Sequence, residues 1–173
     1  MSRTFKRLAY EILDRNRGPE GLVLVGLQTR GVHVARRIAE IIESIEGVDM
    51  PVGVLDVTMY RDDFRVAMKQ PSVQVTSIPF DVEAKTVIIV DDVLYTGRTV
   101  RSALDAIMDF GRPARVRLAV LIDRGHRELP LAADFVGKKI PTAYNEEIRV
   151  RMADVDGVDE VSLVQIEEDG GDD

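Results

Sequence analysis

The sequence contains no cysteine and no tryptophan among its 173 residues. The lack of cysteine excludes disulfides, catalysis by a thiol and metal sites built from thiolates, and it is typical of proteins from a reducing cytosol. No stretch approaches the roughly 18 apolar residues of a membrane-spanning helix, and the basic start of the chain leads into no signal-peptide core. These absences predict a soluble, cytoplasmic protein without a membrane partner.

Basic residues are also outnumbered. There are 23 lysines and arginines against 30 aspartates and glutamates, and the net charge is −7. This balance argues against a general nucleic-acid binder. Five of the acidic residues, however, lie in residues 167–173, a segment predicted to be a disordered tail, and without them the charge is about −2. The first predicted helix carries several basic residues, at Arg3, Lys6, Arg7, Arg15 and Arg17. They are compatible with a local basic face that binds a partner, and equally with an ordinary solvated helix face.

The chain does contain a regular alternation of short apolar runs and amphipathic stretches. Apolar runs predict strands near residues 22–26, 52–59, 73–78, 87–90 and 116–122. Helical spacing of apolar residues predicts helices over 2–16, around 34–45 and over 98–110. Such alternation indicates the α/β class, with a mainly parallel sheet flanked by helices. Because 45% of the residues are hydrophobic and no interior linker is visible, residues 1–166 are predicted to form one domain.

The most informative segment runs from Val87 to Thr99 and reads VIIVDDVLYTGRT. Asp91 and Asp92 close a buried strand, where open α/β sheets hold ligands, and can accept hydrogen bonds from adjacent ribose hydroxyls. The residues after them lie at a predicted helix N-terminus, where backbone N–H groups and hydroxyls bind a phosphate; they are Thr96, Gly97, Arg98 and Thr99. The alternative is an ordinary strand-to-helix turn.

A second loop of the same kind is Gln28–Gly31, again between a strand and a helix. Arg30 offers a cationic fork, and Thr29 offers a hydroxyl, which together suit a diphosphate. The alternative is a plain turn. If both loops lie at one sheet edge, one would take a 5′-phosphate and the other a leaving diphosphate.

Two further segments are expected to border this edge. Residues 59–76 read as a mobile hairpin that could close over the diphosphate, with Arg61 neutralising charge; the alternative is a solvated hairpin. Residues 123–145, with the N-terminal segment, are expected to form a small hood, in which His126 is a surface loop histidine. No spacing of histidine, aspartate and glutamate suggests a metal cage built by the protein.

The run from Val87 to Thr99 resembles the phosphoribosyl diphosphate (PRPP) signature of type I phosphoribosyltransferases. Three further segments narrow the resemblance to the PyrR family of pyrimidine operon regulators, and they read GLQTRG at 26–31, YRDD at 60–63 and DRGHRELP at 123–130. Tyr95 stands where purine-using relatives commonly have an aspartate, which argues against hypoxanthine or guanine as the substrate.

The resemblance implies a uracil phosphoribosyltransferase that makes UMP and diphosphate from uracil and PRPP. It implies that Asp91 and Asp92 hold the ribose, that Tyr95 to Thr99 border the 5′-phosphate, and that Thr29 and Arg30 grip the diphosphate with Arg61. Mg²⁺ is expected to bind mainly through diphosphate oxygens. Uracil is expected to be read by hood groups that the sequence does not identify.

The family's second activity is UMP-strengthened binding to leader RNA of the pyrimidine operon, by which transcription is attenuated. The candidate RNA-binding residues are Lys6, Arg7 and Arg127. The chain departs from familiar members at Tyr10, where a histidine is usual, and at Ala132, where a basic residue is common. Two alternatives therefore stay open: a uracil phosphoribosyltransferase that has lost RNA regulation, and a nucleotide-sensing regulator with little catalysis. The family resemblance also implies a homodimer or a larger homo-oligomer.

Overall fold

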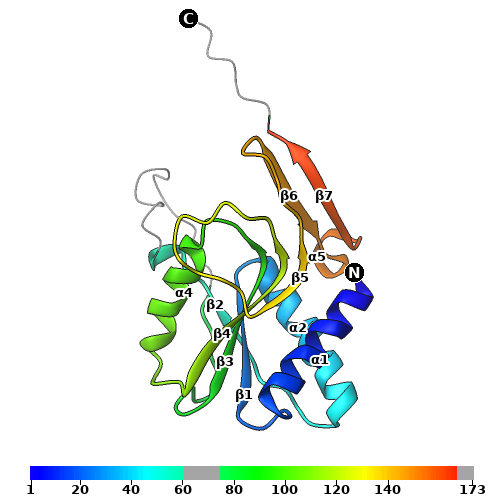
Figure 1. Ribbon diagram of the computed structural model, residues 1–173. Helices are drawn as coiled ribbons and strands as arrows, with labels where there is room; N and C mark the ends of the chain where they lie inside the picture. The colour runs from blue at the N-terminus through cyan, green and yellow to red at the C-terminus, as the bar shows by residue number, and fades with distance from the viewer. Residues whose placement is uncertain (61–74, 167–173) are drawn as a thin grey trace, which may run out of the picture.

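The computed structural model describes residues 1–60 and 75–166, and Figure 1 shows their arrangement. The helices are α1 (Ser2–Asn16), α2 (Arg30–Glu46), α4 (Arg98–Met108) and α5 (Ala153–Asp156), with a 3-10 turn, η1, at Thr58–Tyr60. The strands are β1 (Leu22–Leu27), β2 (Val52–Leu55), β3 (Thr86–Leu94), β4 (Arg115–Asp123), β5 (Phe135–Lys139), β6 (Glu146–Arg151) and β7 (Glu160–Gln165).

Five strands form a central sheet in the order β2-β1-β3-β4-β5, and each neighbouring pair is parallel. Helices α1 and α2 cover one face of this sheet, and α4 covers the other (Figure 1). Strands with helices on both sides must be apolar on both faces, which explains why all six residues of β1 are buried. The predicted α/β class is confirmed.

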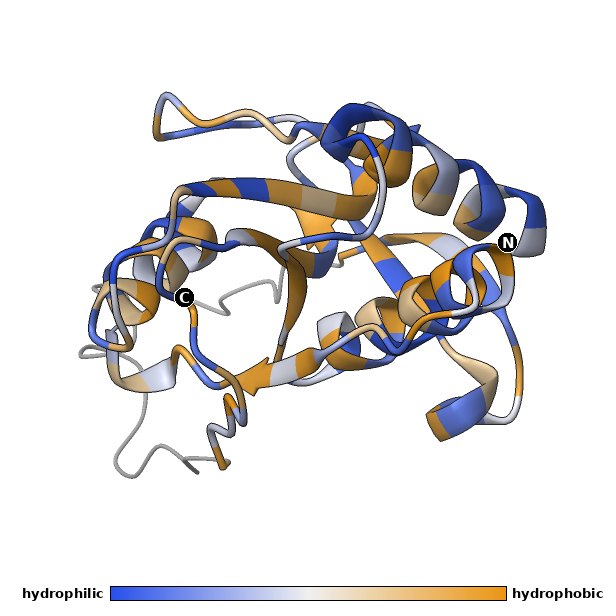
Figure 2. Cartoon of the chain, turned by 90° about the horizontal axis from the view of Figure 1, so that it is seen from below, coloured by the Kyte–Doolittle hydropathy of each residue, from blue (hydrophilic) through white to orange (hydrophobic). Residues whose placement is uncertain are grey.

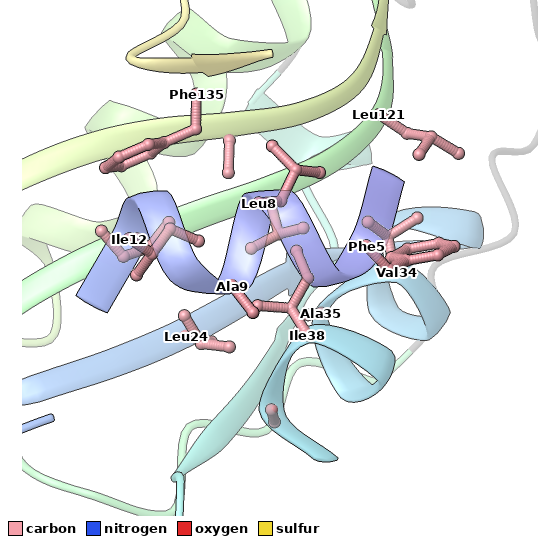
Figure 3. Packing of buried hydrophobic residues seen from close by; sticks show 14 of the residues in the cluster. Phe5, Leu8, Ala9, Ile12, Leu24, Val34, Ala35, Ile38, Leu121 and Phe135 are labelled. Carbon is pink, nitrogen blue, oxygen red and sulfur yellow. The ribbon is translucent and has the colours of Figure 1, made fainter. Parts of the chain in front are cut away.

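Helix α1 shows how the sequence places a helix on the sheet. Phe5, Leu8, Ala9 and Ile12 follow one another at helical spacing, and each is at most 2% exposed. They pack against Ile38 of α2 and against the sheet (Figure 3). Each large apolar side chain buried in this way contributes roughly 1.5–3 kcal/mol. Figure 2 shows the same pattern as alternating hydrophobic and hydrophilic stretches along the helices.

Several predicted element boundaries were wrong. The strand expected over 52–59 ends at Leu55, because Asp56 turns the chain: its carboxylate accepts hydrogen bonds from the backbone N–H and the hydroxyl of Thr58. The strand expected over 73–78 is reduced, in its described part, to one bridge between Ser77 and Val54. The helix expected to reach residue 110 ends at Met108.

The antiparallel hairpin of β6 and β7 has no counterpart in the sequence-based prediction. Ile148 and Val150 of β6 are buried in the core beneath α1 and α2, which fastens the base of the hairpin to the main sheet. Strand β5, inside the segment expected to form the hood, is the edge strand of the main sheet. The division into a main body and a hood stays a prediction, as does the disorder of residues 167–173, which lie outside the described residues.

None of the helices in the described part of the chain is long and apolar enough to span a membrane.

Candidate active site

The two predicted phosphate loops lie side by side at the carboxyl edge of the sheet. Strands β1 and β3 are neighbours, with Gly26 opposite Val90, so the loops that follow them emerge together. Gly31 lies so close to β3 that an added Cβ atom would be 2.6 Å from the Val90 carbonyl oxygen and 3.2 Å from Asp91 Oδ1. Only glycine permits this approach. The structure thus brings the TRG loop into contact with the first aspartate of the other motif.

Asp91 and Asp92 lie inside β3 and not after it, since the strand pairs with β4 as far as Leu94 opposite Asp123. Asp91 is buried, and its Oδ1 accepts a hydrogen bond of 2.9 Å from the Asp92 backbone N–H. Asp92 is half-buried and borders a pocket. The two carboxylates therefore have different surroundings, and Asp92 is the more accessible one.

The loop after β3 is held on both sides. Gly97 has a φ of 94°, a left-handed conformation, and is the N-cap of α4. Thr96 contributes its hydroxyl as an acceptor for the Arg98 N–H at 3.3 Å and its carbonyl as an acceptor for the Glu128 N–H at 2.9 Å. The Arg98 side chain pairs with Glu128 at 2.8 Å. Thr99 lies in the first turn of α4. The predicted helix N-terminus is therefore present, and it is braced by residues 124–131.

Two arginines from that bracing segment were missed or given another role. Arg124, 6% exposed, lies over the Tyr95 ring at 3.9 Å from its centroid and donates to the Thr142 hydroxyl at 3.0 Å. Arg127 donates to the Tyr95 carbonyl and to Asp123, each at 2.5 Å. The repeated arginines of the DRGHR segment were a usable signal, but their direction toward Tyr95 depends on long-range contacts. Both arginines therefore hold the loop through contacts with Tyr95, Arg124 with its ring and Arg127 with its carbonyl oxygen.

His126 differs from its prediction as a surface residue. It is half-buried, its Nε2 lies 2.5 Å from the Thr142 carbonyl oxygen, and its ring contacts those of Tyr95 and Tyr144. These contacts account for its partial burial, and its backbone is left-handed, with a φ of 59°.

The loop after β1 is built differently. The Gln28–Thr29 peptide bond is cis, the Thr29 side chain is exposed, and Arg30 begins α2. Arg30 Nη2 donates to Asp156 Oδ1 at 3.0 Å, whereas Arg30 Nε is buried without a hydrogen-bond partner in the described part of the chain. A buried donor without an acceptor is costly. This loop presents an arginine with unused hydrogen-bonding capacity.

A pocket of about 610 Å³ connects these residues to the β6–β7 hairpin. Arg30 and Asp92 border it on the sheet side, and the hairpin contributes charged side chains of both signs. Its remaining lining residues are Glu147, Ile148, Arg149, Val150, Arg151, Asp156, Glu160, Ser162 and Val164. No role was predicted from the sequence for residues 146–166, so the side of the pocket formed by the hairpin was missed.

The Asp156 carboxylate, which borders the pocket, has a shifted pKa. A hydrogen bond from the Met152 N–H, the hydrogen bond from Arg30, and the positive charges of Arg30 and Arg151 hold the pKa of Asp156 below its usual range. Asp156 is therefore ionised at neutral pH, and it pairs with Arg30.

The candidate RNA-binding residues are not gathered in one place. Lys6 is exposed on α1. Arg7 pairs with Glu11 at 2.7 Å and donates to the carbonyls of Val136 and Gly137, so it covers the open edge of β5. Arg127 lies in the loop after β4 with the contacts given above. Two of the three side chains thus have structural contacts, and their RNA contacts stay a prediction.

Arg61 lies outside the described residues. Tyr60, the last residue before it, donates its hydroxyl to Asp109 Oδ2 at 2.8 Å, and this hydrogen bond raises the pKa of Tyr60. Its carbonyl accepts a hydrogen bond from Ser102 of α4 at 3.1 Å. The chain is therefore fastened to α4 immediately before Arg61.

Within residues 1–60 and 75–166, no group of three or more histidine, aspartate or glutamate side chains has the spacing of a metal site. The carboxylates of Asp92, Glu147 and Glu160 are spread along the pocket wall and alternate with arginines. Such a lining suits a ligand that carries both anionic oxygens and a bound cation.

Comparison with known proteins agrees with this geometry. Residues 1–154 match the family model described as "Phosphoribosyl transferase domain". The chain is 56% identical over 163 residues to the bifunctional protein PyrR of Thermus aquaticus, covering 94% of this chain and 90% of the relative. It is 53% identical over 166 residues to that of Deinococcus deserti, covering 96% and 91%.

The solved structure of a hypoxanthine phosphoribosyltransferase from Trypanosoma cruzi superimposes with a TM-score of 0.65 at 22% identity, covering 82% of this chain and 78% of that one. That likeness concerns the fold. The extensive identity to curated relatives goes further, and it agrees with the motifs at 26–31, 90–101 and 123–130. As the sequence predicted, the chain belongs to the phosphoribosyltransferase family and, within it, to the bifunctional PyrR proteins.

Proposed function

We propose that the protein transfers ribose 5-phosphate from PRPP to N1 of uracil, forming UMP and diphosphate, and that it regulates pyrimidine operon expression by UMP-dependent binding to leader RNA. The observation that carries the enzymatic part is the contact of Gly31 with Val90 and Asp91. It supports a single site, because it brings the helix that Arg30 begins against the strand that carries Asp91 and Asp92. Phosphoribosyl transfer needs these groups together, because the ribose must be held while its two phosphate ends are bound separately.

In the proposed site, the N–H groups and hydroxyls of Thr96 to Thr99 bind the 5′-phosphate, and Asp92 with Asp91 accepts hydrogen bonds from the ribose hydroxyls. Thr29 and Arg30 bind the diphosphate, with Arg61 as a further cation. The transition state resembles an oxocarbenium ion, so the main work of these residues is to hold the ribose and to stabilise the departing negative charge. Asp91 and Asp92 also place negative charge beside the ribose, where positive charge develops.

The residues of the pocket fit a Mg²⁺–diphosphate group. The unpartnered Arg30 Nε complements the negative diphosphate oxygens, and the nearby carboxylates complement the positive Mg²⁺. Bound through the diphosphate oxygens, Mg²⁺ would neutralise charge on the leaving group. Arg30 would bind the same oxygens and align them with the ribose.

Uracil would lie beside Tyr95, under the residues that follow β5. The Tyr95 ring is fixed by Arg124 and by His126, which gives the base a firm wall. An aromatic ring at this position offers no carboxylate to a purine ring nitrogen, which favours a pyrimidine.

For the RNA-binding part, the exposed Lys6 on α1 supplies one cation, and Arg7 and Arg127 supply partly exposed guanidinium groups for RNA phosphates. We infer a cytoplasmic homodimer or larger homo-oligomer, with an RNA surface that extends across subunits. Residues 1–166 would form the phosphoribosyltransferase domain and residues 167–173 an acidic tail.

Two measurements test the proposal. Diphosphate release from Mg²⁺–PRPP should occur with uracil and be much slower with hypoxanthine or guanine; equal rates would remove the pyrimidine preference. Leader RNA from the protein's own pyrimidine operon should be bound at fixed salt, and UMP should tighten the binding. Intact uracil turnover with weak RNA binding that ignores UMP would leave an enzyme without the regulatory activity.

A further inference from the structure

The polar face of the β6–β7 hairpin has no role in the family motifs, yet it forms one wall of the pocket. Residues that are paired across the hairpin lie on the same side, and the pairs on the pocket side include Arg149 with Ser162 and Arg151 with Glu160. Ile148 and Val150, which lie between these residues along β6, are buried in the core and also border the pocket. The apolar face thus fixes the hairpin, and its charged face looks onto Arg30.

Asp156 connects the two walls. Its Oδ2 accepts a hydrogen bond of 2.8 Å from the Met152 N–H, which holds the carboxylate in place. Its Oδ1 accepts the hydrogen bond of 3.0 Å from Arg30 Nη2. The charge of Arg151 also acts on this carboxylate and contributes to lowering its pKa. One fixed carboxylate therefore interacts with guanidinium groups from α2 and from β6.

Both arginines keep capacity for another anion. Arg30 Nε is buried and has no partner in the described part of the chain. Arg151 is paired with Glu160 at 3.3 Å, and the two side chains are 50% and 49% exposed. Such a solvated pair is weak and exchanges readily. A ligand with two anionic groups can use both arginines, whereas the single carboxylate of Asp156 satisfies neither fully.

We propose that Arg30 and Arg151 form a two-arginine cradle for the diphosphate of PRPP, and that Asp156 occupies this cradle when diphosphate is absent. Arg151 is then a further diphosphate-binding residue, and Asp156 competes with the leaving group for Arg30. The inference rests on the proposed function, because it takes Arg30 as a diphosphate ligand. It predicts that the hairpin weakens the binding of the product diphosphate after transfer, since Asp156 can pair with Arg30 again.

The test measures binding of inorganic diphosphate, with Mg²⁺, and separately of UMP to the full chain by calorimetry. Arg151→Gln should weaken diphosphate binding about 5- to 20-fold, as expected for the loss of a charge-assisted hydrogen bond. UMP binding should not change, because UMP has no diphosphate. Asp156→Asn should tighten diphosphate binding about 3- to 10-fold, because it removes a like charge.

The matched control is Arg149→Gln, on the same strand and the same face, since Arg149 pairs with Glu147 at 3.4 Å, whereas the charge of Arg151 acts on Asp156. It should change diphosphate binding less than about 2-fold. Equal effects of Arg151→Gln and Arg149→Gln, equal weakening of UMP and diphosphate binding by Arg151→Gln, or weaker diphosphate binding by Asp156→Asn would each overturn the cradle.

Arg30→Gln separates this inference from the function beneath it. If Arg30→Gln binds diphosphate as the unmodified protein does, the diphosphate loop itself is wrongly assigned, and the cradle fails with it. If Arg30→Gln loses diphosphate binding while Arg151→Gln keeps it, the diphosphate loop stands and only the part of the hairpin is wrong.

Discussion

The loop after β3 and the loop after β1 lie at the same edge of the sheet, where Gly31 contacts Val90 and Asp91 of β3, but they are held by different means. Residues 95–97 are fixed by backbone hydrogen bonds from Glu128 and Leu129 and by Arg127 from below. At the loop after β1, the charge belongs to the long side chain of Arg30, which pairs with Asp156 from a separate element. The loop after β3 is thus held by several contacts to its backbone, whereas the charge of Arg30 is held by its ion pair with Asp156.

This contrast matches the two ends of the proposed substrate. The 5′-phosphate stays attached to the ribose throughout the reaction, so a fixed receptor for it keeps the sugar in register. The diphosphate must be bound in the substrate and released as product, and a shared arginine suits that cycle. The comparison can be tested with substitutions that disrupt the contact of Gly31 with β3, and then with substitutions in the surroundings of each loop.

The largest effect is expected where the start of α2 touches β3. Gly31→Ala puts a Cβ atom 2.6 Å from the Val90 carbonyl oxygen, so the backbone of α2 or of β3 must move. We expect a loss of about 100-fold in kcat/KM for PRPP, because small displacements of positioned groups are costly, and a loss of about 1–3 kcal/mol in the free energy of unfolding. Steady-state kinetics and urea denaturation measure the two.

Gly47→Ala is the control for Gly31→Ala. Gly47 closes α2 with a φ of 69°, and a Cβ atom there would meet no atom within 4 Å. It should cost about 1 kcal/mol of stability through backbone strain and no activity. Equal activity losses in the two variants would mean that the contact of Gly31 with β3 is unimportant for activity.

The next effect concerns the ribose that both loops border. Asp92→Asn should lower kcat/KM about 10- to 100-fold through weaker hydrogen bonds to a neutral acceptor. The melting temperature should stay unchanged, because no hydrogen bond or ion pair to the Asp92 carboxylate is found in the described residues. Asp105→Asn, on the exposed side of α4, is the control. Unchanged PRPP turnover in Asp92→Asn would remove this residue from the ribose site.

The rigid loop is tested by Arg127→Gln. The change removes the donor to the Tyr95 carbonyl and leaves Asp123, 14% exposed, without its cation. We expect a stability loss of about 1–3 kcal/mol and about 3- to 10-fold weaker UMP binding, because ordering the loop then costs free energy on binding. Diphosphate binding should change little. If diphosphate binding falls as much as UMP binding, the two loops are not independent.

Much of the fold followed from the sequence for a physical reason. Strands β1, β3 and β4 are buried on both faces at their centres, so each contains a run of apolar residues that stands out in the chain, at 22–25, 87–90 and 118–122. Helix α1 was predicted from its spacing to its last residue, since a helix on a sheet shows a clear apolar stripe. The motifs at Asp91 and at Thr29 were found because their chemistry lies in consecutive residues.

The missed parts depend on contacts between distant residues. Strands β6 and β7 carry polar and charged residues along one face, so neither contains a long apolar run, and their pairing is set only in the fold. Arg124 could be seen as a basic residue in the sequence, but not as the partner of Tyr95, which lies 29 positions earlier in the chain and in contact with it in the fold. The same holds for Asp156 beside Arg30.

The smallest expected effect concerns the attachment of α5, which carries Asp156, to α2. Asp159 accepts hydrogen bonds from Arg37 of α2 at 2.7 Å and from the Ala153 N–H at 2.8 Å, which fastens α5, and with it Asp156, to α2. The hydrogen bond from Arg37 is the main cause that lowers the pKa of Asp159 from its ordinary value of 3.8. A lowered pKa in the folded state means that this stabilisation is complete above pH 3.8 and is lost as the pH falls through the folded-state pKa.

The difference in melting temperature between the unmodified protein and Asp159→Asn should therefore be constant near neutral pH and shrink below about pH 4. Asp49→Asn, which removes an exposed carboxylate before β2, controls for the loss of one negative charge. A difference that persists at the lowest pH would show that the Asp159 carboxylate does not hold α5 by its charge. UMP binding should be the same in both variants, because α5 contacts the loop of the diphosphate side and not residues 95–97.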